Sequence, residues 1–385
     1  MLKRYLEKQQ LNQGAIDLFI HHIIRMVGTG LLGIFGPIYV YQVSGSVSIL
    51  LLYNALVFLV VAVFDPLMMR VVNKIGFKSS MVTSLFFISG MFGALYMAGV
   101  TEFAVEWLIV AALLQSINIM LYWVPYHVDF TELTNRKTRG ENLALLTATI
   151  TIIAIILPVT SSSIIERYGF GLLFILSVAF VLFSSLYVRK IPVIKEKYSY
   201  GYLQTYRELF SKKHRRLFIG FFADGVQGMV GAIIWPVFIF LLLEGDFYSV
   251  GIITAVILLA TVIIRFVVGD LADHMSKSKL VKYSTVFHAL GWVFKSIVAT
   301  PFQIFLAGTY HDMTGSATRV SFDSLMYEQA DKSLHYIDEY SVLREISLCM
   351  ARVVVMVLAV VMIQFAGIES LFWVAAVASL FMGFL

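Results

Sequence analysis

The stretch "VVGDLADHMSKSK", Val267–Lys279, interrupts an otherwise apolar part of the chain. The residues up to and into it read "VGIITAVILLATVIIRFVV", and the residues after it begin "LVKYSTVFHALGWVF". An apolar run of about 20 residues is long enough to cross the hydrocarbon core of a bilayer as a helix. The polar stretch is therefore expected at a membrane surface, between two membrane-spanning helices.

The composition extends this interpretation to the whole chain. Of the 385 residues, 59% are hydrophobic and 14% are charged, whereas globular domains hold roughly 25% charged residues. The mean hydropathy is +0.85. These values exclude a large soluble protein and predict an all-α membrane protein, because helices satisfy their own backbone hydrogen bonds within lipid. The single cysteine, Cys349, excludes an intramolecular disulfide.

Twelve apolar runs are predicted to be transmembrane helices, with bounds known to within a few residues. They cover residues 16–41, 48–69, 79–100, 105–126, 142–165, 170–188, 217–243, 249–268, 281–300, 302–325, 340–365 and 368–385. The longest polar segment falls between the sixth and seventh runs and divides the twelve into two sets of six. We therefore expect an N-terminal bundle over 1–189, a cytoplasmic linker over 190–216 and a C-terminal bundle over 217–385.

Lysine and arginine residues gather in alternate loops. One side of the membrane collects the segment 189–216 and Lys3, Arg4, Lys8, Lys74, Lys78, Arg136, Lys137, Arg139, Lys277, Lys279 and Lys332. In the loops of the other side, Arg167 is the one lysine or arginine residue. Since basic loops face the cytoplasm, both termini are predicted to be cytoplasmic. The protein is expected in the plasma (inner) membrane. The net charge of +5 is thus a topology signal, compatible with contacts to anionic lipid and not a sign of nucleic-acid binding.

The linker contains the segment "YLQTYRELF", residues 202–210, whose apolar residues have helical spacing. Two interpretations of this segment stay open. It is either an amphipathic helix that lies on the membrane surface or a plain helix within a cytoplasmic linker.

The two halves of the chain repeat weakly. The segment "GIFGPIYVYQ" in the first run resembles "AIIWPVFIFL" in the seventh, which aligns Pro37 with Pro236. In that register "RVVNKIGFK" falls opposite "DLADHMSKSK", with Asn73 near Asp273. Internal repeats of this kind are typical of membrane transporters, whose binding sites lie between the repeats.

The segment "GDLADHMSKSK" resembles the loop of the major facilitator superfamily, whose pattern is roughly G-x-L-A-D-R-x-G-R-K between helices two and three. The first-half loop fits less well, since Asn73 stands where the aspartate is usual. The resemblance covers the whole chain and implies two pseudo-symmetric six-helix bundles. It also implies a cytoplasmic gate, in which a carboxylate accepts from the N–H groups of a helix N-terminus. The expected gate residues are Asn73, Lys74, Gly76, Lys78, Gly269, Asp273 and Lys277. The alternative is a solvated loop whose lysines only set the topology.

Polar and ionisable residues within the spans mark the expected transport pathway, because such groups usually face protein or a water-filled cavity. The resemblance places spans one, four, seven and ten around a central cavity. The candidates for the substrate and proton pathway are His21, Arg25, Gln115, Asn118, Asp224, Gln227, His311, Asp312 and Arg319. A purely structural role, such as interhelical hydrogen bonding, is the alternative for each of them.

Two expectations within this set are specific. Asp312 is predicted to be the proton-coupling carboxylate, with a structural pairing to Arg319 as the alternative. Arg25 and Asp224 take nearly equivalent places once the two halves are aligned, and they are expected to approach each other as an ion pair in at least one state.

A second set of charges lies in spans two, eight and eleven, which the resemblance places at the contact between the bundles. Structural ion pairing is expected there for Asp65, Arg265, Glu345 and Arg352. Span nine carries His288 and Lys295, and the resemblance places this span at the lipid-facing periphery.

The sequence shows no G-x-x-x-x-G-K-[ST] phosphate-binding loop, metal-ligand cluster or nucleophile arrangement. We therefore expect neither an enzyme nor a cofactor. The predicted function is secondary active transport of a small solute by alternating access, coupled to protons. A uniporter or facilitator, a non-transporting receptor of the same fold and, more remotely, an intramembrane enzyme built on His311 and Asp312 are the alternatives. A pathway with both signs of charge suits an amphiphilic, zwitterionic or anionic solute, and we expect a monomer in the lipid bilayer.

Overall fold

The computed structural model consists almost entirely of long helices. It describes residues 13–134, 139–193, 198–272, 277–332 and 337–384. Within these ranges the description is limited to the backbone at residues 139–145, 265–272, 277–282, 320–321, 323–332 and 337–338.

The N-terminal half contains the first six spans. Its helices are α2 (Gln13–Gly30), α3 (Phe35–Ser44), α4 (Val47–Ile75), α5 (Phe77–Val100), α6 (Ala104–Leu133), α7 (Arg139–Phe183) and α8 (Ser185–Val188). Helices α2 and α3 form one span. Helix α7 holds the fifth and sixth spans, because Gly169, at φ 73°, breaks its helical backbone. Glycine reaches this left-handed conformation without the clash that a Cβ would cause, so the chain reverses there.

The C-terminal half contains the other six spans. Its helices are α10 (Arg215–Met229), α11 (Trp235–Leu242), α12 (Phe247–Ala272), α13 (Lys277–Ser296), α14 (Pro301–Lys332), α15 (Ile337–Ala366) and α16 (Ser370–Phe381). A π-helical turn, Val230–Ile234, joins α10 to α11 into one span. The short helix α9 (Tyr202–Leu209) lies in the linker between the halves.

The described residues thus contain the twelve passes that the sequence predicted. Eight helical stretches in this part of the chain are long and apolar enough to cross a membrane by composition, and one of them, Leu146–Val188, holds two passes. The predicted bounds fall short most clearly at three helices. Helix α4 runs to Ile75, α6 to Leu133 and α14 to Lys332, past the ends of their apolar runs, because the residues that follow continue the same helix.

Spans one and seven are interrupted at matching places. In span one the helix opens between Gly30 and Phe35, one turn before Pro37. In span seven the π-helical turn directly precedes Pro236. Proline has no N–H for the helical ladder and its ring crowds the preceding turn, so kinks and π-bulges gather next to it. The shared interruption supports the alignment of the two prolines in the sequence repeat.

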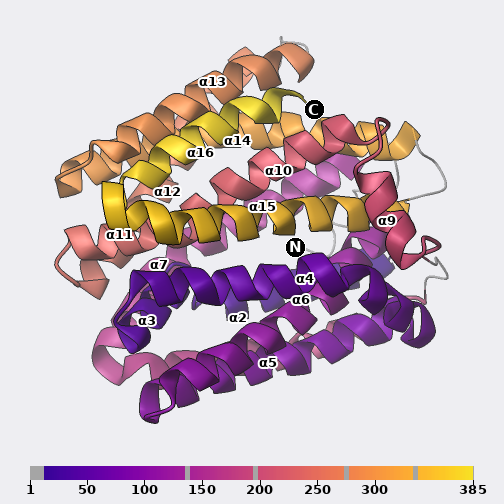
Figure 1. Ribbon diagram of the computed structural model, residues 1–385, viewed down its shortest axis with the longest axis horizontal. Helices are drawn as coiled ribbons and strands as arrows, with labels where there is room; N and C mark the ends of the chain where they lie inside the picture. Colours follow the sequence, from indigo (N-terminus) through magenta and orange to yellow (C-terminus); the bar gives the residue numbers. More distant parts are fainter. Residues whose placement is uncertain (1–12, 135–138, 194–197, 273–276, 333–336, 385) are drawn as a thin grey trace.

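The two halves lie side by side, with the N-terminal half below and the C-terminal half above in Figure 1. Helix α4 packs along α15, α7 packs along α12, and α3 meets α11 at the end of the bundle away from the linker. One apolar core of buried residues runs through both halves. Many outward-facing side chains are also large and apolar, such as Phe86, Ile152 and Val354, as expected of a surface that contacts lipid. Helix α9 lies at the other end of the bundle, against α4 and α15 (Figure 1).

Candidate functional site

Helix α2 carries two buried histidines that face different neighbours. The Nδ1 of His21 lies 3.0 Å from the carbonyl oxygen of Ser184, to which it donates. The Nδ1 of His22 lies 2.9 Å from the phenolic oxygen of Tyr122 on α6. His21, a predicted pathway residue, therefore helps to join α2 to the end of the sixth span, while its neighbour contacts the aromatic face of α6.

Arg25 lies one turn further along α2 and is buried, with 3% of its surface exposed. Its Nη2 donates to Oδ1 of Asn118 at 3.4 Å. Its guanidinium lies 3.6 Å from the ring centre of Tyr122 and 5.8 Å from that of Trp123, within the range of cation–π attraction. Within the described part of the chain, Arg25 has no ion-pair partner and its Nε has no hydrogen-bond partner. This cation thus sits among neutral groups.

The amide side chains of α6 extend this cluster. Asn118, which accepts from Arg25, donates through Nδ2 to Oε1 of Gln115 at 3.3 Å. The structure therefore brings together three of the predicted pathway residues on spans one and four.

A second polar cluster lies in the C-terminal half, and it begins with a bidentate ion pair. Nη1 and Nη2 of Arg319 on α14 donate to the two carboxylate oxygens of Asp224 on α10, each at 2.8 Å. The Asp224 side chain is 5% exposed and that of Arg319 is 44% exposed. Gln227, one turn along α10, donates to Asp224 Oδ1 at 2.9 Å. Fork-to-fork pairs of this kind are stronger and more directional than single charge contacts.

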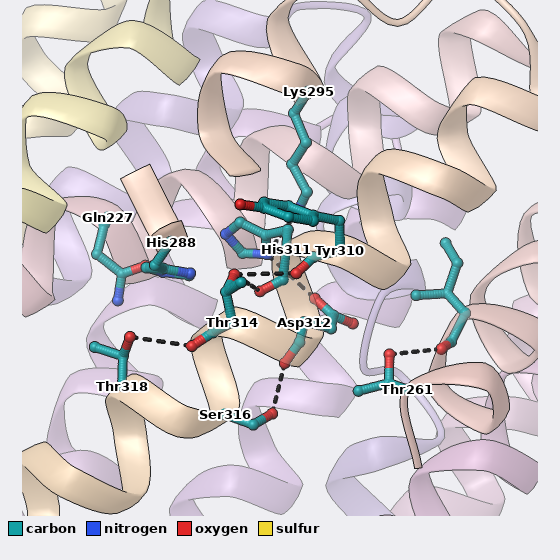
Figure 2. A network of polar contacts seen from close by, with 11 residues as sticks. Gln227, Thr261, His288, Lys295, Tyr310, His311, Asp312, Thr314, Ser316 and Thr318 are labelled. Atoms are coloured by element: carbon teal, nitrogen blue, oxygen red, sulfur yellow. Dashed lines mark hydrogen bonds and ion pairs between the residues drawn. The ribbon is translucent and has the colours of Figure 1, made fainter. Parts of the chain in front are cut away.

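The cluster continues through two histidines to Asp312 (Figure 2). Nε2 of His288 lies 3.2 Å from Oε1 of Gln227, and the rings of His288 and His311 are 4.4 Å apart. Nδ1 of His311 lies 3.2 Å from Oδ1 of Asp312, whose side chain is 33% exposed. Gln227, His311 and Asp312 are thus brought together as predicted, through His288 on span nine. The Asp312 side chain is half-buried.

Span nine corrects one expectation from the sequence. Lys295 and His288, expected at the lipid-facing periphery, are 1% and 4% exposed and face into the C-terminal half. Nζ of Lys295 lies 3.1 Å from Nδ1 of His311 and 4.3 and 4.7 Å from the ring centres of Trp235 and Trp292. A buried ammonium needs polar and aromatic partners, and spans seven and ten supply them. The hydroxyls of Thr314 and Thr318 on α14 bond to carbonyl oxygens of the same helix (Figure 2).

In the state that this structure shows, the partner of Asp224 is not Arg25. The sequence suggested Arg25, whereas in this structure Arg319 binds Asp224 and Arg25 binds neutral groups. Both partners of the observed pair belong to the C-terminal half. Close packing of α10 on α15 fixes the position of Asp224, because a Cβ on the adjacent Gly225 would approach within 2.7 Å of the Leu348 carbonyl oxygen.

A polar contact joins the two halves between α6 and α15, beside buried charges on α15 and α4. Nε2 of His127 on α6 lies 3.3 Å from Nη1 of Arg344 on α15. The Glu345 carboxylate forms ion pairs with Arg344, at 3.8 Å, and with Arg352, at 3.6 Å. The expected pairing of Glu345 with Arg352 is therefore present. Asp65, expected in an ion pair, is fully buried in α4, and neither of its oxygens has a hydrogen-bond partner among the described residues.

The expected gate is only partly described. Asp273 lies outside the described residues, and for Arg265, Gly269 and Lys277 only the helical backbone is described. In the first-half loop, Lys74 is exposed at the end of α4, and Gly76, at φ 83°, separates α4 from α5, with Lys78 half-buried after it. Asn73 bonds to the backbone of Tyr198 in the linker.

Seven residues described in the clusters were not among the predicted site residues. They are His22, Tyr122, Trp123, His127, His288, Lys295 and Arg344. Three of them belong to the segment "YWVPYH" of α6, whose aromatic residues recur at helical spacing, and this was the signal that could have identified them. The described residues include no group of three or more histidine, cysteine or carboxylate side chains that could hold a metal ion.

Comparison with known proteins places the chain in a family. The sequence profile of the Major Facilitator Superfamily matches residues 18–333, which is most of the chain. The protein belongs to the major facilitator superfamily. Among curated protein sequences, none matches this chain significantly.

Solved structures agree with this superfamily fold. The human organic anion transporter MFSD10 (TETRAN) superposes with a TM-score of 0.71 at 12% identity, over 97% of this chain and 99% of that one. A POT family transporter in complex with 5-aminolevulinic acid gives a TM-score of 0.69 at 12% identity, over 96% and 94%. A POT family transporter with a thioalcohol-conjugated peptide gives 0.71 at 12% identity, over 96% and 94%. Membership of the major facilitator superfamily confirms the predicted all-α, twelve-helix fold and the prediction of a transporter and not an enzyme.

Proposed function

We propose that this superfamily member is a secondary active transporter that moves a small carboxylate-bearing solute by alternating access. The observation that carries the proposal is Arg25, a buried guanidinium with neutral partners among the described residues. A guanidinium matches a carboxylate through two parallel hydrogen bonds, so an anionic or zwitterionic solute is the natural partner for this group. We also propose the division into bundles 1–189 and 217–385 joined by the linker 190–216.

Two further observations support an acidic solute. Arg344 reaches from the C-terminal half to His127 on α6, whose ring stacks with Trp123 at 5.9 Å beside Arg25. The side chains around the first and fourth spans are therefore rich in cations and aromatic faces. Among the structurally similar transporters, one is described as an organic anion transporter and another holds 5-aminolevulinic acid.

Proton coupling is the second part of the proposal, with Asp312 as the coupling carboxylate. Its position beside His311 and near Lys295 supports this role. A carboxylate that binds a proton in one state and a cationic partner in another lets the two events bias the same conformational equilibrium. Hydrogen bonds and one contact between histidine rings connect Asp312 to Asp224, and this connection would let the protonation state of Asp312 affect the Arg319 pair.

A ligand screen followed by flux measurement tests the solute class. Small carboxylic acids and their neutral amides are compared for stabilisation of the purified protein, since a ligand of the folded state raises the unfolding temperature. Stabilising acids are then tested for uptake into proteoliposomes. Stabilisation by amides and acids alike would contradict the proposal. Flux that no proton gradient accelerates would indicate a uniporter, and binding without flux would indicate a receptor.

Replacement of the coupling carboxylate should separate proton-driven transport from exchange. Asp312→Asn is expected to reduce pH-gradient-driven flux in proteoliposomes at least tenfold while leaving solute counterflow within about twofold of the unmodified protein. Counterflow needs no net proton movement, so it survives the loss of a titratable group. The amide keeps the size of the side chain and can still bond to His311.

Ser316→Ala is the matched control for this substitution. Ser316 lies one turn from Asp312 and donates to the Asp312 carbonyl oxygen, so it perturbs the same segment without removing an acid. We expect it to retain both fluxes. If gradient-driven flux persists in Asp312→Asn, the coupling group lies elsewhere, and Asp224 is the next candidate.

We propose that the protein lies in the plasma (inner) membrane. In the proposed orientation both termini and the linker face the cytoplasm. On a Cys349→Ser background, Leu203→Cys in α9 and Tyr168→Cys at the opposite end present thiols at side chains that are 79% and 68% exposed. A membrane-impermeant maleimide added to intact cells should label Tyr168→Cys and leave Leu203→Cys unlabelled until the membrane is opened. The reverse pattern would invert the topology.

A further inference from the structure

The linker segment Tyr198–Leu209 is held between the two halves at one end of the bundle. Its helix, α9, contacts both α4 and α15 (Figure 1). Thr205 and Leu209 are fully buried and Tyr198 is 5% exposed. The Tyr198 hydroxyl bonds to Thr205 Oγ1, which fixes the start of the segment against its own helix. The segment is therefore a packed part of the fold and more than a connection between the halves.

The first attachment to α4 is made by Asn73. Its Nδ2 donates to the Tyr198 carbonyl oxygen at 2.8 Å, and its Oδ1 accepts from the Tyr198 N–H at 3.1 Å. An amide can make this pair of bonds because it donates and accepts, whereas an ionised carboxylate only accepts. The resemblance leads us to expect aspartate at position 73. An ionised aspartate could not make both of the bonds that Asn73 makes here.

The second attachment to α4 involves a carbonyl that proline leaves free. Pro66 has no N–H, so the Ala62 carbonyl, four residues earlier in α4, lacks its usual helical partner. The Tyr206 hydroxyl donates to this oxygen at 2.7 Å and to the Val63 oxygen at 3.1 Å. Burial raises the pKa of Tyr206, so its phenol stays protonated and keeps donating at neutral pH. The linker therefore completes the hydrogen bonding of the second span.

Among the described residues, a carboxylate on α15 binds the linker to the other half. Glu339, at the start of α15, accepts from the Ser199 N–H at 3.0 Å and also from the Ser199 hydroxyl. Glu339 is 2% exposed. The neighbours Tyr198 and Ser199 are thus bound on one side to the end of α4 and on the other side to the start of α15.

We propose that the segment Tyr198–Leu209 is a strap that belongs to the N-terminal half and closes the linker end of the transporter by binding Glu339. This inference rests on the alternating access proposed above, in which the two halves separate at one end at a time. Asn73 and Tyr206 keep the strap on α4, and the bond between Ser199 and Glu339 is the one that breaks when the linker end opens. The strap therefore sets the population of the state that is open at that end.

The distance between the halves at the linker end tests this proposal. On a Cys349→Ser background, spin labels at Ile75→Cys on α4 and Tyr283→Cys on α13 occupy side chains that are 40% and 59% exposed. The distance distribution is measured by pulsed electron paramagnetic resonance without solute or proton gradient. Glu339→Ala should increase the population with the longer distance about tenfold, the scale of one hydrogen bond to a charged group. Ser199→Ala should have a smaller effect, since the N–H remains.

Asn73→Asp provides a second, independent variant. It replaces a donor by a charge next to the Tyr198 carbonyl, so the strap should leave α4 and the open population should again rise several-fold. The matched control is Asp246→Ala, because Asp246 accepts from the N–H and hydroxyl of Ser249 in the same pattern at the opposite end of the bundle. It should leave the distance unchanged.

Two outcomes would overturn the strap. One is an unchanged distance in all three variants Glu339→Ala, Ser199→Ala and Asn73→Asp. The other is an equal shift in the control Asp246→Ala. The distance measurement needs neither solute nor proton gradient, so its outcome is independent of the solute and coupling proposals. A protein that fails to move acids could still show the strap, and a carboxylate transporter could still lack it.

Discussion

Arg319→Ala is expected to destabilise the protein by about 3 kcal/mol, and Asp224→Ala by about 1 kcal/mol, although the two residues form one ion pair. Removal of the arginine leaves the Asp224 carboxylate, 5% exposed, without its bidentate partner. Removal of the carboxylate leaves a guanidinium that is 44% exposed and can be hydrated. The cost of an uncompensated charge depends on how much water reaches it, so the burial difference sets the order of the two effects.

Equilibrium unfolding in mixed detergent micelles measures both free energies, with Arg216→Ala as a control. Arg216 is an exposed arginine at the start of α10, and its removal should change stability by less than about 0.5 kcal/mol. The double variant Asp224→Arg with Arg319→Asp should lose less free energy of unfolding than the two single variants lose in sum. Equal costs for Arg319→Ala and Asp224→Ala, or strictly additive losses in the exchange, would show that the pair does not act as a buried unit.

Arg25→Gln is expected to weaken binding of the carboxylate solute about 100-fold, provided the solute binds where we propose. Each hydrogen bond to a charged group contributes about 1.5–3 kcal/mol, and each 1.4 kcal/mol corresponds to a tenfold change in affinity. Arg25→Lys should also lose most of the affinity, because an ammonium keeps the charge but lacks the planar fork that a carboxylate engages. Calorimetric titration with an acid identified in the screen gives the dissociation constants.

Arg70→Ala is the matched control for Arg25. Arg70 lies on α4 in the same half, its side chain is exposed, and it belongs to neither α2 nor α6. Its removal should leave affinity unchanged. Arg25→Gln could instead weaken the binding of an acid and of its neutral amide equally. That outcome would show that Arg25 supports the fold of the cluster and does not bind the carboxylate.

Local patterns in the sequence were enough to predict the helical architecture. The number of spans follows from apolar runs of about 20 residues, since in lipid a spanning segment must be a helix of about that length. The matched interruptions before Pro37 and Pro236 follow from proline chemistry. The predicted pathway residues on spans seven and ten also prove to be neighbours, because polar groups within a membrane protein avoid lipid.

The partner of each charge could not be predicted in the same way. Asp224 and Arg319 are 95 residues apart in the chain, and Arg25 was an equally plausible partner by helical register. Lys295 was assigned to the periphery and is buried against Trp235 and Trp292. In a soluble helix the apolar face marks the inside. In a membrane helix lipid and protein neighbours are both apolar, so the hydrophobic pattern does not mark which face is buried.

The sequence by itself therefore determined that this chain crosses the membrane twelve times in two related halves, because that depends on segment length and local backbone chemistry. Only the tertiary structure decided that Arg319 binds Asp224, that Asn73 holds the linker backbone, and that Glu339 joins the linker to the other half. Those contacts depend on the rotation of each helix about its axis and on packing between distant segments. No pattern within a single apolar run records either of these.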